Sequence, residues 1–140
     1  MKLLLQILSI LRAIHWSHWT SHWKSTGETS YQDHLLFERL YTGVSEEIDT
    51  LAEKIAGIYG PKSLGELSLL SDSYRFLAVH SELGLYQHAL AIEEHLQKAL
   101  RSAYDRLKES GELSLGLDDY LMATASSHET NLYLLRQKLR

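Results

Sequence analysis

The stretch HWSHWTSHW, at residues 15–23, repeats a His-Trp pair three times at spacings of three and four residues. Residues three and four apart are neighbours on the surface of an α-helix. On such a helix, His15, His18 and His22 lie within a wedge of about 60°. Neutral imidazole is a common metal ligand, so this face could bind a metal ion. A helix that buries its tryptophans and solvates its histidines explains the pattern at least as well.

Four more side chains of types that bind metals follow in the next predicted helix. They form two pairs at a spacing of four residues, His34 with Glu38 and Asp49 with Glu53. This spacing places each pair on one helix face, and the four angular positions together span only about 100°. One face of the second helix is therefore rich in imidazole and carboxylate.

A tight turn between the two helices would bring their metal-binding faces together. If the turn is centred near residue 28, His22 faces His34 and His18 faces Glu38. Two imidazoles and a carboxylate then meet between the helices, and this combination of ligands suits iron or zinc. The pairing predicts a metal site between the two helices.

Asp49 and Glu53 cannot join this site within one chain. Asp49 follows His34 by 15 residues, which is about 22 Å along a helix axis. Two copies of the helix that pair antiparallel about a twofold axis would remove this distance, because His34 of one copy then meets the two carboxylates of the other. The helices would cross near Gly43, where a glycine lets two backbones approach closely. Such a pairing generates two equivalent sites.

The elements that must position these residues are long helices. No alternating strand pattern is present, and Pro61 is the only proline. Apolar residues at steps of three and four predict four long helices and a short fifth in the connection between the second and third. Their expected ranges are 3–25, 30–56, 71–79, 82–108 and 117–139. The predicted fold class is all-α, an antiparallel four-helix bundle in one domain over residues 1–140.

The composition excludes several kinds of site. The chain has no cysteine, so disulfides, thiolate metal sites and cysteine nucleophiles are absent. A formal net charge of −4 lacks the basic footprint of a nucleic-acid binder. Residues 1–11 are read as the start of the first helix rather than a signal peptide, and their apolar run is too short to cross a membrane. We expect a cytoplasmic protein that does not bind membranes.

Residues 22–54 resemble the diagnostic segment of Dps-type mini-ferritins, which belong to the ferritin-like superfamily. That segment has a His-Trp pair, a glycine shortly after it, a second histidine twelve residues past the first, then F..LY and D...E. These places are held here by His22-Trp23, Gly27, His34, Phe37, Leu40-Tyr41, Asp49 and Glu53. The likeness is weaker over residues 117–139 and weakest over residues 57–83.

The resemblance implies a hollow dodecamer that binds Fe²⁺ at its twofold interfaces. It implies a ferroxidase that oxidises this iron, usually with hydrogen peroxide, and stores the ferric product, which limits oxidative damage. By resemblance, His22 and His34 come from one subunit, and the catalytic and metal-binding set is completed by Asp49 and Glu53 of its mate. Glu38 occupies a position that is acidic in the family. Zinc could replace iron, and His18 is a candidate ligand of a second iron.

Other functions and other clusters stay open beside this hypothesis. A non-catalytic ferritin-like shell or a metal-binding protein could hold a structural ion on the same residues. A DNA-compacting protein is disfavoured, because neither predicted terminal helix leaves room for the Lys/Arg-rich tail that many Dps proteins use. We interpret Trp23 as packing in the dimer interface. Polar residues on or before the third long helix are interpreted as solvated, namely His80, Glu82, His88, Glu93, Glu94 and His95.

Overall fold

The structure, a computed structural model that describes all 140 residues, is built from helices without a strand. Apolar side chains at helical spacing and few chain breakers account for this. The α-helices are α1 (Lys2–Lys24), α2 (Ser30–Tyr41), α3 (Val44–Tyr59), α4 (Glu66–Val79), α5 (Leu85–Ser110) and α6 (Leu115–Lys138), and η1 (Pro61–Ser63) is a short 3₁₀ turn. The all-α prediction is confirmed.

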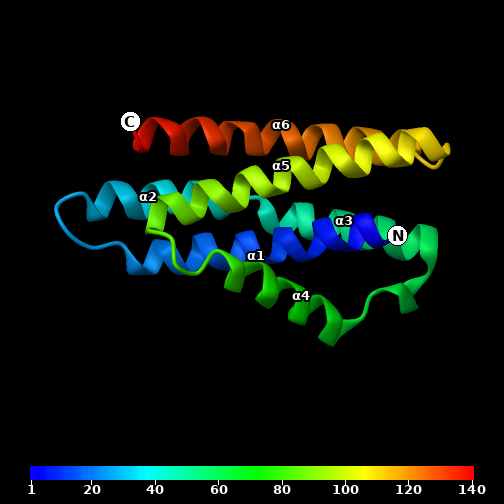
Figure 1. Ribbon diagram of the computed structural model, residues 1–140, viewed down its shortest axis with the longest axis horizontal. Helices are drawn as coiled ribbons and strands as arrows, with labels where there is room; N and C mark the ends of the chain where they lie inside the picture. The colour runs from blue at the N-terminus through cyan, green and yellow to red at the C-terminus, as the bar shows by residue number, and fades with distance from the viewer.

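Four rods make up the bundle. Helices α1, α5 and α6 run along most of the molecule, and α2 and α3 follow one another along the fourth rod beside α1 (Figure 1). Helix α4 packs against α1 at the edge of the molecule and is longer than the predicted range 71–79. None of the helices is both long enough and apolar enough to cross a membrane. The bundle predicted from the sequence, with its longer connection between the second and third rods, is confirmed.

The expected continuous helix over residues 30–56 is wrong, because the second rod is broken in its middle. Helix α2 ends at Tyr41 and α3 begins at Val44. Between them, Gly43 has a backbone φ of 89°, in the left-handed region. Other residue types pay roughly 1–2 kcal/mol for this conformation. A glycine therefore fits this position for a reason within the chain, whether or not a second backbone approaches it.

Replacing Gly43 and Gly57 by alanine should change stability in opposite directions. The variant Gly43→Ala should lose about 1–2 kcal/mol of the free energy of unfolding, because alanine is strained at positive φ. Gly57 lies inside α3, and a Cβ added there meets nothing within 4 Å. The variant Gly57→Ala should therefore gain about 0.4–1 kcal/mol. Urea denaturation measures both, and a stabilising Gly43→Ala would contradict the assigned backbone conformation.

A polar layer interrupts the hydrophobic core. The larger apolar cluster has 18 buried residues, mostly from α1, α3, α5 and the start of α6. A smaller cluster consists of Phe37, Leu40, Ala89 and Leu135. On α5 and α6, the polar side chains of Glu93 and His128 are fully buried between residues of the two clusters. Buried charges need partners, so this layer must be hydrogen-bonded.

The tryptophans of α1 face outward, so the interpretation that they are core residues is wrong. Trp16 and Trp23 are 54% and 55% exposed, whereas His18 is completely buried. The apolar stripe that faces the core contains leucines, isoleucines and alanine from the first four turns and continues through Ser17 and His18. Each chain therefore presents an aromatic surface beside the histidines.

Candidate metal centre

His22 and His34 meet where α1 and α2 lie side by side. Their imidazole rings are stacked, with centroids 3.5 Å apart and planes inclined by 23°. The expected hairpin pairing of these two residues is confirmed. Both side chains are half-buried at the edge of the bundle, so the pair is held by protein on one side and remains reachable from the other.

Reciprocal hydrogen bonds fix the orientation of the two imidazoles. Nδ1–H of His22 donates to the backbone carbonyl of His34 at 2.7 Å, and Nδ1–H of His34 donates to that of His22 at 2.8 Å. In the neutral rings, the lone pair of each then lies on Nε2, and neither Nε2 has a hydrogen-bond partner in the chain. A backbone carbonyl on Nδ1 is the usual way to orient a histidine that ligates metal through Nε2.

Asp33 anchors the start of α2 and thereby the neighbouring His34. Its carboxylate accepts hydrogen bonds from Thr29, at 2.9 Å, and from the hydroxyl of Tyr86 on α5, and it lies 3.0 Å from Nζ of Lys138 on α6. Burial would raise the pKa of Asp33, but these partners outweigh it and lower the pKa. An ionised Asp33 thus ties α2 to two other rods.

Asp49, Glu53 and Glu38 are not brought to the histidine pair within the chain. All three are exposed, and their side chains make no hydrogen bond or ion pair. His34 lies on α2 and Asp49 on α3, on opposite sides of the break at Gly43 and 15 positions apart in the sequence. A continuous helix of that length would span about 22 Å. No group of three or more His, Asp or Glu side chains in one chain is arranged to hold a metal ion. One copy therefore provides two imidazoles and, far from them, two unpaired carboxylates.

The expected contact between His18 and Glu38 is wrong. His18 lies in the core, where its Nε2 is 2.9 Å from Oε1 of Glu93 on α5, whereas Glu38 is exposed on α2. The reason is the helical twist, since four residues advance the side chain by about 40° beyond a full turn. The side chain of His18, about one turn before His22, therefore points into the bundle.

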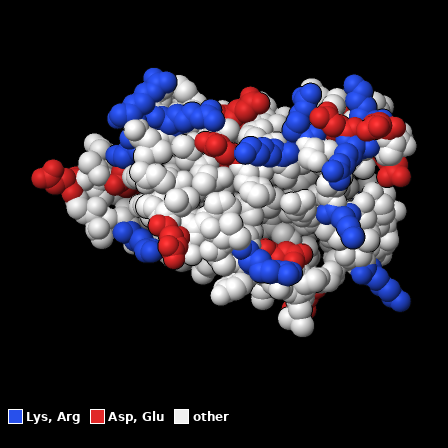
Figure 2. Space-filling view, in the orientation of Figure 1, with Lys and Arg blue, Asp and Glu red and all other residues white.

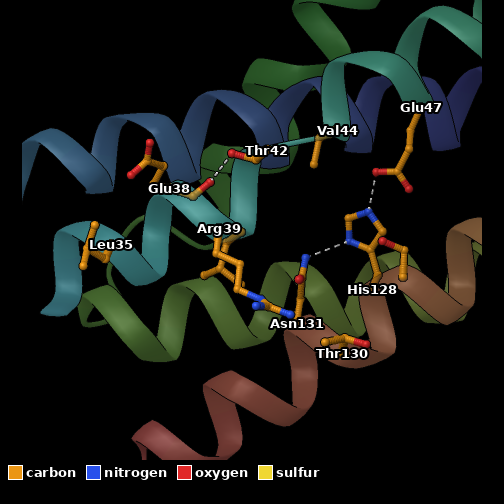
Figure 3. A pocket seen from close by; sticks show the side chains of 11 residues that line it. Leu35, Glu38, Arg39, Thr42, Val44, Glu47, His128, Thr130 and Asn131 are labelled. Atoms are coloured by element: carbon orange, nitrogen blue, oxygen red, sulfur yellow. Dashed lines mark hydrogen bonds and ion pairs between the residues drawn. The ribbon is translucent and has the colours of Figure 1, made fainter.

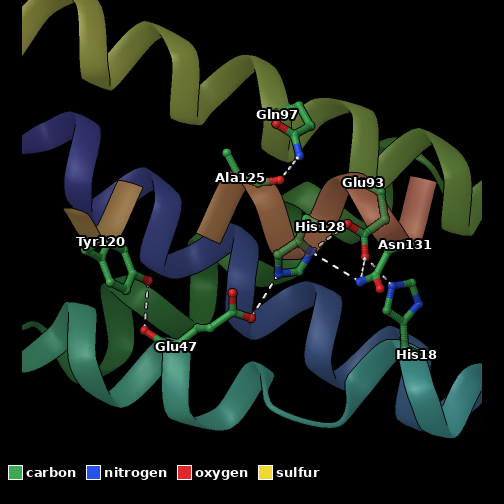
Figure 4. Close-up of polar contacts among 8 residues, drawn as sticks. All are labelled: His18, Glu47, Glu93, Gln97, Tyr120, Ala125, His128 and Asn131. Carbon is green, nitrogen blue, oxygen red and sulfur yellow. Dashed lines mark hydrogen bonds and ion pairs between the residues drawn. The ribbon is translucent and has the colours of Figure 1, made fainter. Parts of the chain in front are cut away.

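Four helices contribute to a buried network around Glu93 (Figure 4). One carboxylate oxygen of Glu93 accepts from His18 of α1 at 2.9 Å and from Asn131 of α6 at 3.1 Å. The other accepts from Nδ1–H of His128, on α6, at 2.7 Å. Nε2–H of His128 donates to Glu47 of α3 at 2.9 Å. Since both ring nitrogens of His128 donate to carboxylates, the geometry fits an imidazolium ion.

The ionisation of the network follows from these contacts. Burial would lower the pKa of His128, but the hydrogen bonds and charges of Glu47 and Glu93 outweigh it and raise the pKa to about 10. Burial would raise the pKa of Glu93, but His128 and His18 lower it to about 2. Both groups therefore stay charged over the physiological pH range.

The interpretation of Glu93 as a solvated residue is wrong, and the sequence analysis does not predict a role for His128 or Glu47. The sequence pattern does, however, indicate that Glu93 and His128 are buried. Glu93 lies on the apolar stripe of its helix with Ile92 and Leu96, and His128 lies between Leu121 and Leu135 at core spacing. A polar residue at a position that the periodicity assigns to the core predicts a buried partner. The partners themselves come from other helices and could not be named.

A cleft leads from solvent to this network. It has a volume of about 550 Å³ and opens between the α2–α3 junction and α6 (Figure 3). Arg39 and Thr42 line one side, Asn131 lines the other, and Glu47 and His128 are hydrogen-bonded to each other at the wall. The helix break at Gly43 thus lies beside the exposed end of the buried network.

Comparisons with known proteins identify the fold. No family model matches the sequence, and no curated protein matches it. Among solved structures, Dps from Thermosynechococcus elongatus superposes with a TM-score of 0.82 at 20% identity, covering 99% of this chain and 90% of that one. The DPS protein from Vibrio cholerae O1, described as a member of a broad superfamily of ferritin-like diiron-carboxylate proteins, gives a TM-score of 0.82 at 18% identity, covering 99% and 87%. The chain has the Dps-like, ferritin-like fold.

Proposed function

We propose that the chain is a ferroxidase subunit that binds Fe²⁺ between two copies of itself and oxidises it with hydrogen peroxide. The observation that carries this proposal is the His22–His34 pair, in which hydrogen bonds to backbone carbonyls leave both Nε2 atoms free for metal. The partner chain would contribute Asp49 and Glu53. Imidazole and carboxylate together bind ferrous iron and leave positions for an oxidant.

A second copy supplies what one chain lacks. The two carboxylates are exposed and unpaired, and they lie on α3, beyond the break at Gly43 from His34 of their own chain. An antiparallel pairing of two α2–α3 rods about a twofold axis near Gly43 would place each carboxylate pair against the other chain's histidines. The twofold then creates two identical sites.

The surface of the isolated chain favours such an association. Large apolar side chains are exposed along α1 and α4, namely Trp16, Trp19, Trp23, Leu67, Leu70, Tyr74 and Val79. Trp16, Leu70 and Tyr74 line one hollow between the two helices, and exposed apolar patches mark interaction sites. We propose that part of this apolar surface is covered in the dimer. Because Dps proteins share the fold, we further propose that dimers assemble into a hollow dodecamer that stores the ferric product.

Oxidation by paired ions would protect the cell. Two ferrous ions donate two electrons to one peroxide molecule, which is reduced to water without release of hydroxyl radical. The oxidised iron is removed from further reaction when it is stored as a ferric mineral. The fold shared with a ferritin-like diiron-carboxylate protein supports this reading.

Substituting single histidines of α1 should distinguish a metal ligand from a histidine that only lies nearby. His22→Ala should lower the rate of iron oxidation by at least about 10–100-fold, the loss caused even by groups that only support a ligand. His15→Ala is the matched control from the same helix, because His15 packs against Tyr41, with ring centroids 5.9 Å apart, rather than near a carboxylate. Its rate should stay near wild type. Stopped-flow absorbance of the ferric product after Fe²⁺ and peroxide are mixed measures both.

The same assay distinguishes catalysis from a structural ion. A ferroxidase gives a rapid rise in ferric absorbance and keeps many iron atoms per chain in solution. A protein that holds a structural ion such as zinc keeps its ion and does not catalyse the oxidation of added iron, so peroxide oxidises the iron in solution and ferric hydroxide precipitates. Equal rates for His22→Ala, His15→Ala and wild type would contradict the proposed site.

DNA should bind weakly at physiological salt. The formal net charge is −4, and on the face in Figure 2 acidic side chains are interspersed among Lys and Arg. Affinity for DNA depends on releasing counterions by neutralising phosphates, which needs a concentrated basic surface. A gel-shift experiment at neutral pH should leave the DNA unretarded. Retardation that disappears steeply with added salt would show that the protein has a concentrated basic surface and would contradict this prediction.

A further inference from the structure

Three histidines outside the proposed iron site gather where the end of α4 meets the first half of α5. The imidazole ring of His80, which caps the C-terminal end of α4, has its centroid 5.9 Å from that of His95 and 6.2 Å from that of His88, both on α5. The ring planes of His80 and His95 are nearly perpendicular, at 89°. Phe76 packs against both of these rings, with centroids 5.2 and 5.0 Å away. The chain thus holds a second pair of imidazoles against an apolar wall.

Hydrogen bonds orient His80 and leave one of its ring nitrogens free. Nδ1–H of His80 donates to the backbone carbonyl of Phe76 at 3.0 Å, so the lone pair of the neutral ring is on Nε2, which has no hydrogen-bond partner in the chain. A backbone carbonyl on Nδ1 is the usual way to orient a histidine that ligates metal through Nε2. The backbone of His80 is held as well, because its carbonyl accepts from Nδ1–H of His88 at 2.9 Å.

The other two histidines differ in whether their nitrogens are already used. Nε2 of His88 accepts from the hydroxyl of Ser17 on α1 at 3.0 Å, so both of its ring nitrogens are engaged. The ring of His95 is exposed and makes no hydrogen bond with the chain. The two imidazoles with free lone pairs are therefore those of His80 and His95, and His88 holds the backbone that positions His80.

We propose that His80 and His95 together bind one late first-row divalent cation, Cu²⁺ most tightly, with water at its remaining positions. Imidazole nitrogen lies about 2.0–2.1 Å from a bound Zn²⁺, which places the centroids of two rings on one ion about 5–6 Å apart. The observed separation of 5.9 Å fits this range. No third His, Asp or Glu side chain is arranged to join the pair.

The composition of this pair favours copper over iron. Imidazole suits Cu²⁺, Zn²⁺ and Ni²⁺, and the affinity of a given site for divalent first-row metals peaks at Cu²⁺. The proposed iron site differs, because it combines imidazole with carboxylates. The copper proposal uses none of the residues of that site, so it does not rest on the function proposed above.

Copper binding is tested in full-length protein that carries His22→Ala and His34→Ala, because that pair of imidazoles would otherwise compete. Cu²⁺ at one ion per two chains should give an electron spin-echo envelope modulation spectrum with two coupled imidazoles. Adding His80→Ala or His95→Ala should leave at most one. Each should weaken Cu²⁺ binding in calorimetry by at least about tenfold, the loss caused even by groups that only support a ligand. His15→Ala, a half-buried histidine of α1, is the matched control and should change neither measurement.

Combining the two substitutions distinguishes one shared site from two independent histidines. If one ion is held by both rings, the variant with both His80→Ala and His95→Ala should lose little more affinity than either single variant, because each substitution already breaks the chelate. Circular dichroism checks that every variant is folded. Additive losses, a two-imidazole spectrum that survives either substitution, or affinities equal to that of His15→Ala would overturn the proposal. Since no step measures iron oxidation, failure of copper binding would leave the proposed ferroxidase function standing.

Discussion

Protein reassembled from equal amounts of His34→Ala and Glu53→Ala chains should regain iron-oxidation activity that each variant lacks alone. In a mixed dimer, both lesions fall in one site, because His34 of one chain belongs with Glu53 of the other. The second site then has its full set of ligands. Random pairing makes half of the dimers mixed, each with one intact site of two, so the activity should reach about a quarter of wild type.

The matched control combines two lesions from the same side of the site. Reassembled His22→Ala and His34→Ala chains place one damaged histidine in each site of every mixed dimer, so no activity should return. Stopped-flow ferric absorbance measures both mixtures after the variants are unfolded and refolded together. Recovery in both mixtures, or in neither while each variant folds and assembles normally, would contradict a site shared about a twofold axis.

The parts of the candidate site that could be predicted from sequence are local ones. The pairing of His22 with His34 needs only two helices and a short turn, so the helical period and the position of the turn determine it. The same reasoning misplaced His18. It pairs residues by their equal distance from the turn, and this ignores the rotation of side chains around the helix from one turn to the next. A small error in angle there moves a side chain from the surface into the core.

Contacts between segments that are distant in the sequence could not be predicted from the spacing of apolar residues. The break at Gly43 was missed because apolar spacing continues from Leu40 through Val44, and a left-handed glycine leaves no mark in periodicity. The Glu93 network joins residues 35 to 81 positions apart. Periodicity places each of these residues on a helix face, but it does not state which faces meet, so the partners of a buried charge remain unknown until the helices are packed.

Removing the carboxylate at the centre of this network should destabilise the protein strongly. Glu93→Leu should cost about 3–5 kcal/mol of the free energy of unfolding, because it leaves the buried imidazolium of His128 with one carboxylate instead of two. Glu94→Leu is the matched control on the same helix. The side chain of Glu94 is 43% exposed, and its Oε1 lies 3.9 Å from Nη2 of Arg136. A solvent-accessible pair of this kind contributes less than about 1 kcal/mol. Equal urea midpoints for the two variants would contradict a stabilising role for the network.

The pH dependence of stability identifies the ionised pair behind this loss. Below pH 6.5, His128 is protonated both folded and unfolded, and between 6.5 and about 10 only the folded chain keeps the proton, so stability falls as the pH rises through this window. In the acidic range, Glu93 determines the pH dependence. Its contribution to the free energy of unfolding is lost as the pH falls from 4.5 towards about 2. Glu93→Gln keeps hydrogen-bonding capacity without the charge, which should lower the pKa of His128. Its stability should therefore decline less between neutral and alkaline pH than that of wild type, and an unchanged slope would show that the pair does not hold the proton on His128.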